Sequence, residues 1–269
     1  MAYTTIDDPS AFFQTALYTS TGSALSVVNT GNSDLQPDLI WIKSRSEGQL
    51  NCLFNSFHTG EFLSSNLVAA SDTSAGGVTS YNTDGFSIGT LGGINNGTNT
   101  HVAWQWKTGT AFSNDASSTS VGTIDSVGSV NTDAGFSIQT WTGTGSGGTI
   151  AHGLGAVPSF MIVKNRSDGG RNWPVYFGDR TKYMYLSDTI AQANAGTIIW
   201  NNTTPTSTVF SVGNDNGVNE SSKNYVGYVF AEKKGYSKTG SYIGNGNVDG
   251  TFVYTGFKPA FILQKNTAR

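Results

Sequence analysis

The 269-residue sequence contains few charged residues, one cysteine and no long hydrophobic run. Asp, Glu, Lys and Arg make up 12% of the chain, against about 25% in an average soluble domain. The single cysteine, Cys52, excludes an internal disulfide framework. No stretch approaches the ~20 consecutive apolar residues of a membrane-spanning helix, and the N-terminus lacks the basic and apolar regions of a secretory signal. We therefore expect neither membrane insertion nor secretion, and stability that comes from packing.

Small and polar residues take the place of the missing charge, with 34 glycines and long stretches of Thr, Ser and Asn. The 15 Lys and Arg nearly balance the 18 Asp and Glu, whereas nucleic-acid binding normally requires a basic face. The 6 Trp, 11 Tyr and 15 Phe supply enough bulky apolar surface for a core. The composition therefore predicts a folded protein without a nucleic-acid partner.

One pattern occurs three times: a proline, five residues and a lysine, preceded by a Gly/Thr-rich turn. The three copies are Pro37 to Lys43, Pro158 to Lys164 and Pro259 to Lys265. From the second glycine of each turn to the proline the spacing is 15, 13 and 13 residues. Self-similarity at near-constant spacing is typical of repeated structural units.

The segments downstream of the first two copies also correspond, 84–90 to 208–214 and 101–109 to 225–235. The alternative is a single β domain whose strands are similar by coincidence. The sequence predicts an N-terminal arm at 1–13, a first unit at 14–110, a linker at 111–134, a second unit at 135–235, and a partial third repeat or inter-subunit strand segment at 236–269.

The repeated motif predicts a buried central strand. Residues 39–42 and 160–163 are apolar at every position, which is typical of a strand covered on both faces. The proline at the start of such a strand does little harm to its hydrogen bonding, and the basic residues follow at the far end. We assign a structural role to the motif residues Pro37, Trp41, Lys43, Arg45, Pro158, Lys164, Arg166, Pro259 and Lys265.

Short runs with two-residue periodicity between Gly, Asn, Asp and Ser predict an all-β fold. In the first unit, Val102, Trp104 and Trp106 share the expected core face of one strand. Their counterparts are Val226, Tyr228 and Phe230. The expected fold is two tandem antiparallel β-sandwich modules of jelly-roll or lectin-like type, plus the start of a third. A short helix is compatible only with residues 189–195.

No motif for catalysis or metal binding is evident. The three histidines, His58, His101 and His152, lack partners at metal-ligand spacing, and no G-x-S-x-G elbow opens a helix. A glycosidase would need two carboxylates about 5–10 Å apart, but most aspartates stand in turn sequences. We expect no catalytic residue, no metal and no cofactor, with a polysaccharide depolymerase as the enzymatic alternative.

Two tryptophans are the best candidates for ligand binding. Trp141 and Trp200 stand beside polar loop residues, where an exposed ring can stack on a sugar, although both could equally close the ends of a sandwich. The segment 214–220 is rich in side-chain oxygens and is either a plain loop or a partial calcium loop. The candidate binding residues are Trp141, Trp200, Asn201, Asp215 and Asn216.

Taken together, these motifs resemble a family of repeated modules in virion and tail-fibre-type proteins of tailed bacteriophages, especially marine ones. The resembling segments are 7–19, 35–46, 83–90, 101–109, 152–167, 225–246 and 255–265. The first unit departs from the family pattern at 51–60, where an acidic residue and an arginine are usual.

The resemblance implies a non-enzymatic virion protein, made in the host cytoplasm, that serves as a tail-fibre or other appendage component. Its implied partners are other virion proteins, further copies of itself, as a trimer by analogy with fibres, and a host-surface glycan. Capsid and tail positions both remain open at this point. The alternative functions are a carbohydrate-binding module and a depolymerase.

Overall fold

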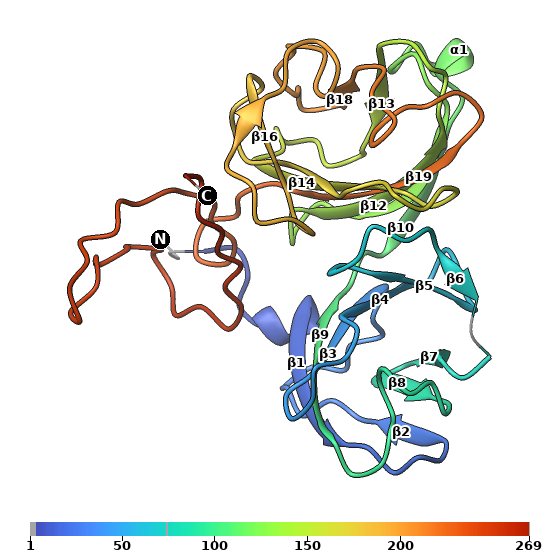
Figure 1. Ribbon diagram of the computed structural model, residues 1–269, viewed down its shortest axis with the longest axis vertical. Helices are drawn as coiled ribbons and strands as arrows, with labels where there is room; N and C mark the ends of the chain where they lie inside the picture. Colours follow the sequence, from blue (N-terminus) through green and yellow to red (C-terminus); the bar gives the residue numbers. More distant parts are fainter. Residues whose placement is uncertain (1–3, 74, 269) are drawn as a thin grey trace.

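The computed structural model describes residues 4–73 and 75–268 (Figure 1). The chain is mostly β, with several antiparallel sheets and one short α-helix among the described residues. The first half holds a short 3-10 helix and nine strands: η1 (Pro9–Ala11), β1 (Phe13–Thr19), β2 (Leu25–Val27), β3 (Leu39–Ser44), β4 (Cys52–Asn55), β5 (Glu61–Ser64), β6 (Asp72–Thr73), β7 (Val78–Asn82), β8 (Gly85–Ile88) and β9 (Thr100–Trp106).

The second half holds the α-helix and ten strands: β10 (Thr110–Asn114), α1 (Ala116–Thr119), β11 (Ser126–Asn131), β12 (Phe136–Thr142), β13 (Gly148–Ala151), β14 (Phe160–Asn165), β15 (Pro174–Tyr176), β16 (Lys182–Tyr185), β17 (Ala193–Asn194), β18 (Val209–Val212) and β19 (Asn224–Phe230).

The same strand order occurs in both halves. In the first, a large sheet has the order β1-β9-β3-β4-β5-β6 and a small sheet the order β2-β8-β7. In the second, the large sheet contains β12-β19-β14-β15-β16-β17 in the equivalent order, and β13 pairs with β18 as β2 pairs with β8. The motif strands β3 and β14 therefore occupy the same position, next to β9 and β19 respectively. We call the two halves the first and second unit.

The segment 111–134, for which we predicted a linker, is ordered and lies largely in β10, α1 and β11. These strands extend the second large sheet beyond β12, so the full order begins β10-β11-β12. The Asp115 carboxylate caps α1 by accepting hydrogen bonds from the Ser117 and Ser118 amides. Small residues such as Gly128 allow close strand contact, since a Cβ there would lie 2.4 Å from the Ile138 carbonyl oxygen.

The helix considered for 189–195 is not formed. Ala193 and Asn194 instead form β17, which pairs with β16 through Tyr183 and Lys182. A seven-residue segment is too short to be helical by propensity alone, so pairing with a neighbouring strand decides its conformation.

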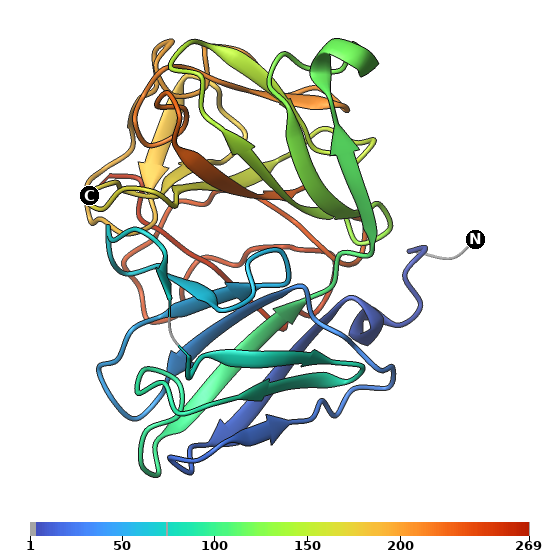
Figure 2. The same cartoon turned by 90° about the vertical axis from the view of Figure 1, so that its right-hand side faces the viewer.

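Three apolar clusters lie between the four sheets. One lies between the large and small sheets of the first unit and a second between those of the second unit. The third lies between the two large sheets, which therefore pack face to face in the middle of the molecule. In both views the second unit lies above the first (Figure 1, Figure 2). The two units thus share a core rather than standing apart.

The predicted central position of the motif strand is confirmed. Ile40 and Ile42 point into the core of the first unit, whereas Leu39 and Trp41 lie in the cluster between the large sheets. In β14, Met161 and Val163 face the unit core, and Ile162 faces the first unit. Alternating side chains point to opposite faces of a strand. The apolar run is uninterrupted because one face of the strand lies in the core of its own unit and the other face lies in the core between the units.

The strand β9 is also covered on both sides. Val102 and Trp106, on the expected core face, are buried, and Trp106 belongs to the cluster between the units. The opposite face carries Ala103 and Gln105, both 0% exposed. The Trp106 face of β9 therefore joins the core shared with the second unit, whereas Ala103 lies in the core of the first unit.

The C-terminal segment, residues 236–268, forms loops along one side of both units (Figure 1). The third copy of the motif lies here, and residues 259–265 are in no strand. Several large apolar side chains of this segment are exposed, among them Ile243, Val248, Phe252, Tyr254 and Ile262.

Candidate functional site: the junction between the units

Of the two readings that the sequence left open for Trp141 and Trp200, an exposed ring that stacks on a sugar or a side chain that closes the end of a sandwich, the structure agrees with burial. Trp141 is 4% exposed; its ring stacks on Tyr225 at 5.5 Å, and its indole N–H donates to the Val218 carbonyl. Trp200 is 1% exposed, and its indole N–H donates to the Lys182 carbonyl. Neither ring offers a free face to a sugar, because each side chain points into the core of the second unit.

The other binding candidates serve the backbone of turns. Asn201 is exposed and has a positive φ of 49°, a conformation that asparagine tolerates. The Asp215 carboxylate accepts a hydrogen bond from the Gly217 amide at 2.7 Å. Asn216 is exposed, and its carbonyl accepts from the Asn165 amide and the Tyr225 hydroxyl. The segment 214–220 thus acts as a structural loop that braces β14 and β19.

The equivalent motif lysines have opposite environments. Lys43 is exposed, and its Nζ contacts only Asn51 Oδ1, at 3.3 Å, among the described residues. Lys164 is fully buried. Its Nζ donates to the carbonyls of Val68, at 3.2 Å, and Arg171, at 2.5 Å. A lysine buried in this way connects the second unit to the backbone of the first.

The contacts around Lys164 offset part of the cost of burying its charge. Its Nζ lies 5.5 Å from the centre of the Trp173 ring, in the geometry of a cation–π contact. Burial lowers the pKa of Lys164 to about 8, because desolvation disfavours the charged form. Trp173 itself is 0% exposed and donates its indole N–H to the Leu67 carbonyl at 2.9 Å.

A second connection between the units is the ion pair of Arg166 with Glu61. Arg166 Nη2 lies 2.5 Å from Glu61 Oε2, and the arginine side chain is 13% exposed. The Arg166 carbonyl accepts from both the amide and the hydroxyl of Ser71. The Arg171 amide also donates to the Val68 carbonyl. Residues 61–71 of the first unit are therefore joined to 164–173 of the second by a continuous set of hydrogen bonds.

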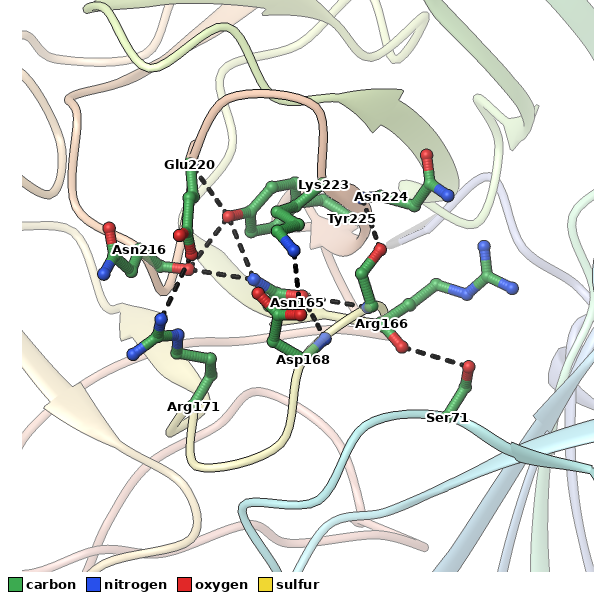
Figure 3. A network of polar contacts seen from close by, with 11 residues as sticks. Ser71, Asn165, Arg166, Asp168, Arg171, Asn216, Glu220, Lys223, Asn224 and Tyr225 are labelled. Atoms are coloured by element: carbon green, nitrogen blue, oxygen red, sulfur yellow. Dashed lines mark hydrogen bonds and ion pairs between the residues drawn. The ribbon is translucent and has the colours of Figure 1, made fainter.

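Asn165 organises the polar network behind this contact (Figure 3). Its Nδ2 donates to the Asn216 carbonyl and the Tyr225 hydroxyl, and its Oδ1 accepts from the amides of Ser167 and Asp168. Two ion pairs flank the network: Lys223 with Asp168 at 3.0 Å and Arg171 with Glu220 at 3.2 Å. The Asn165 side chain thus holds the turn after β14 and links it to β19.

His58 lies beside the ion pair, in the segment where the first unit departs from the family pattern. Its Nδ1 is 3.1 Å from Asn55 Oδ1. Burial and the positive charge of Arg166 lower the pKa of His58 to about 4, so the imidazole is neutral near pH 7. A neutral ring beside an arginine that is already paired with Glu61 is poorly suited to proton transfer.

A polar groove of about 540 Å³ lies next to the junction. The side chains around it are mainly hydroxyl, amide and carboxylate groups, most of them on or beside the neighbouring strands β10, β11, β12 and β19 of the second large sheet. Its lining includes His58, Asp115, Asp125, Thr140, Arg166 and Asn224.

The remaining histidines serve packing. Burial lowers the pKa of His152 to about 4; its Nδ1 accepts from the Leu154 amide, and its Nε2 lies 3.2 Å from the Thr206 carbonyl. His101 stacks on Tyr18 at 5.0 Å. Within residues 4–73 and 75–268, no three His, Cys, Asp or Glu side chains gather as a metal site would require. In the same residues, no helix is long and apolar enough to cross a membrane.

Comparison with known proteins gives a family and no function. Neither the curated proteins nor the solved structures contain a match to this chain. One protein-family model matches residues 8–269, and it is described as a domain of unknown function, DUF7483. The match covers both units and the C-terminal segment, so the chain belongs to the DUF7483 family.

Proposed function

We propose that the chain is a non-enzymatic structural component of a bacteriophage virion, serving as a spacer and attachment element of a tail fibre or another appendage. In this proposal each unit is a β-sandwich module of the jelly-roll or lectin-like type. The observation that carries it is the repeated strand order of two units that share one core. The phage assignment itself comes from the resemblance of the sequence motifs.

The junction favours a mechanical role. Burying one large apolar side chain contributes about 1.5–3 kcal/mol, and the cluster between the large sheets contains twelve buried apolar residues. Lys164 and the Arg166–Glu61 pair add polar contacts at the edge of this cluster. Units joined in this way resist movement relative to each other, as a spacer requires.

The test is the protein content of purified phage particles. Mass spectrometry of particles purified by density gradient is expected to find peptides of this chain in fixed proportion to the other virion proteins. Absence of the chain from particles, with the chain present in the infected cell, would refute the proposal. A parallel assay for reducing ends released from host polysaccharide is expected to give none.

A second function, the binding of a neutral oligosaccharide, is favoured by the polar groove. Its hydroxyl and amide side chains both donate and accept hydrogen bonds, and its arginine is already paired with Glu61. Calorimetric titration with neutral oligosaccharides should show saturable binding that is weakened in Asn224→Ala. The control is Asn96→Ala, an exposed asparagine outside the groove. Equal affinity of the two variants would refute this function.

A further inference from the structure

The third copy of the motif can be compared position by position with the first two. Counting from the proline, Phe261 corresponds to Leu39 and Phe160, and Ile262 to Ile40 and Met161. In the two complete units the first of these positions faces the other unit and the second faces the core of its own unit. By this comparison, Phe261 should face the core between the units, and Ile262 should face a unit core.

Phe261 already occupies the environment that this register assigns to it. Its ring lies 5.3 Å from the rings of Trp104 and Trp106 and 6.2 Å from those of Trp41 and Phe13. These side chains belong to the cluster between the large sheets or pack against it. The third motif thus uses its inter-unit face in the same way as Leu39 does in the first unit.

The opposite face of the third motif is uncovered. Ile262 is 73% exposed, whereas its counterparts Ile40 and Met161 are 0% and 1% exposed. Phe252 and Tyr254, just upstream, are 85% and 74% exposed. An exposed apolar surface of this kind usually marks an interaction site. Of the three copies, only the third has its unit-core face in solvent.

In the complete units this face is covered because the motif strand is part of a sheet. β3 is hydrogen-bonded to β9 and β4, and β14 to β19 and β15. Among the described residues, no strand pairs with 259–265. Just beyond this stretch, the Gln192 amide donates a hydrogen bond to the Thr267 carbonyl. The motif is therefore held by the Phe261 ring and by Lys265, whose Nζ donates to the Asp188 carbonyl, but it lacks strand partners.

An open strand edge is available elsewhere on the same chain. β1 is the edge strand of the first large sheet, whereas its equivalent in the second unit, β12, is covered by β11. Leu17 in β1 is 63% exposed. Uncovered edges with apolar side chains readily accept an additional strand. The chain thus presents both an apolar segment without a strand partner and an edge without a covering strand.

We propose that the C-terminal segment, residues 251–265, binds a second copy of this chain by strand addition along the outer edge of β1. The bound copy covers Ile262 and Phe252, and the segment covers Leu17. Such β-augmentation supplies main-chain hydrogen bonds together with apolar contacts. The two surfaces differ, so the contact is head-to-tail and repeats from copy to copy. This deepens the proposed structural role, because head-to-tail contacts build elongated or ring-shaped assemblies.

Sedimentation velocity of the full chain over a concentration series tests this interface. We expect association that weakens at least about tenfold in Ile262→Asp, a change of about 1.4 kcal/mol or more in binding free energy. Leu17→Asp on the other surface is expected to have the same effect. The control is Ile198→Asp, an exposed isoleucine of the second unit (50%) outside both surfaces, which should associate like the wild type.

Both test positions are exposed, so the variants should keep the wild-type circular dichroism spectrum and melting temperature. A chain that stays monomeric at every concentration overturns the proposal. So does an Ile262→Asp or Leu17→Asp variant that associates as strongly as Ile198→Asp. A monomeric chain found in purified particles would overturn self-association while leaving the virion role intact, so the two failures are distinguishable.

Discussion

Replacing Lys164 by methionine tests how the junction is built. Methionine keeps most of the length of the side chain and removes the buried charge. The Val68 carbonyl still accepts from the Arg171 amide, but the Arg171 carbonyl loses the Nζ donor. Leaving a buried carbonyl unsatisfied costs about 1–3 kcal/mol. Removing the charge relieves the desolvation that lowers the pKa of Lys164 to about 8.

The two effects are of similar size near pH 7, so the pH dependence is the informative quantity. The pKa of Lys164 lies near 8 in the folded chain, against an ordinary value of 10.5. At about 1.4 kcal/mol per pH unit, this difference corresponds to about 3 kcal/mol against folding below pH 8. Between pH 8 and 10.5 the unfolded chain binds this proton and the folded chain does not, so stability rises with pH.

Between pH 8 and pH 9, the free energy of unfolding of the wild type should rise by about 1 kcal/mol relative to that of Lys164→Met. Urea unfolding followed by tryptophan fluorescence at pH 7, 8 and 9 measures it. Tyrosines such as Tyr225, whose pKa burial raises to about 12, affect both proteins equally and cancel in the difference. The matched control is Lys43→Met, the exposed lysine of the first motif. An identical pH dependence for the wild type and Lys164→Met would refute the reasoning.

Three further predictions concern stability. Trp141→Ala should lower the free energy of unfolding by about 3–5 kcal/mol in urea denaturation, because it leaves a large cavity in a core. Gly85→Ala should cost about 1–3 kcal/mol in the same assay, because φ is +98° and the new Cβ would lie 2.1 Å from the Val27 carbonyl oxygen. Burial lowers the pKa of both His58 and His152 to about 4, so stability should fall as pH drops from about 6.5 to 4. His152→Asn should flatten that fall in acid titrations followed by circular dichroism, and an unchanged profile would contradict this assignment.

The strand content and the position of the motif strand could be predicted from the sequence, because alternation and uninterrupted apolar runs are local signals. The run at 39–42 indicates two covered faces. It does not say what covers each face. Leu39 and Trp41 belong to the same apolar cluster as Phe136, which is more than 90 residues away in the sequence. The shared core could therefore not be derived from the repeat alone.

Residues at the same position of the motif also differ in burial, and the cause lies outside the motif. Lys43 and Lys164 have the same local sequence context, yet only Lys164 is covered, because residues 61–71 of the first unit lie over it. The one sequence signal for this contact is Glu61, a carboxylate that directly precedes the apolar Phe62 and Leu63 in β5. Its partner Arg166 is 105 residues away, and no spacing rule connects them.

For the two tryptophans the sequence left exposure and burial both open. Polar neighbours at Trp141 and Trp200 suggest exposed loops, but the direction of the side chain decides burial. Trp141 lies on β12 with its ring toward the core, while the neighbouring Thr142 is exposed. Alternation within a strand outweighs the polarity of the turn that follows it.

Hydrogen–deuterium exchange of the three motif copies tests the central claim. This claim is that two copies of the motif form buried strands, whereas the third copy binds another chain. Residues 39–44 and 160–165 should exchange slowly at every concentration, because both strands are hydrogen-bonded on two edges. Residues 259–265 should exchange fast in the dilute chain and slow down as the concentration rises. Slow exchange of 259–265 in the dilute chain, or fast exchange at every concentration, would contradict the account.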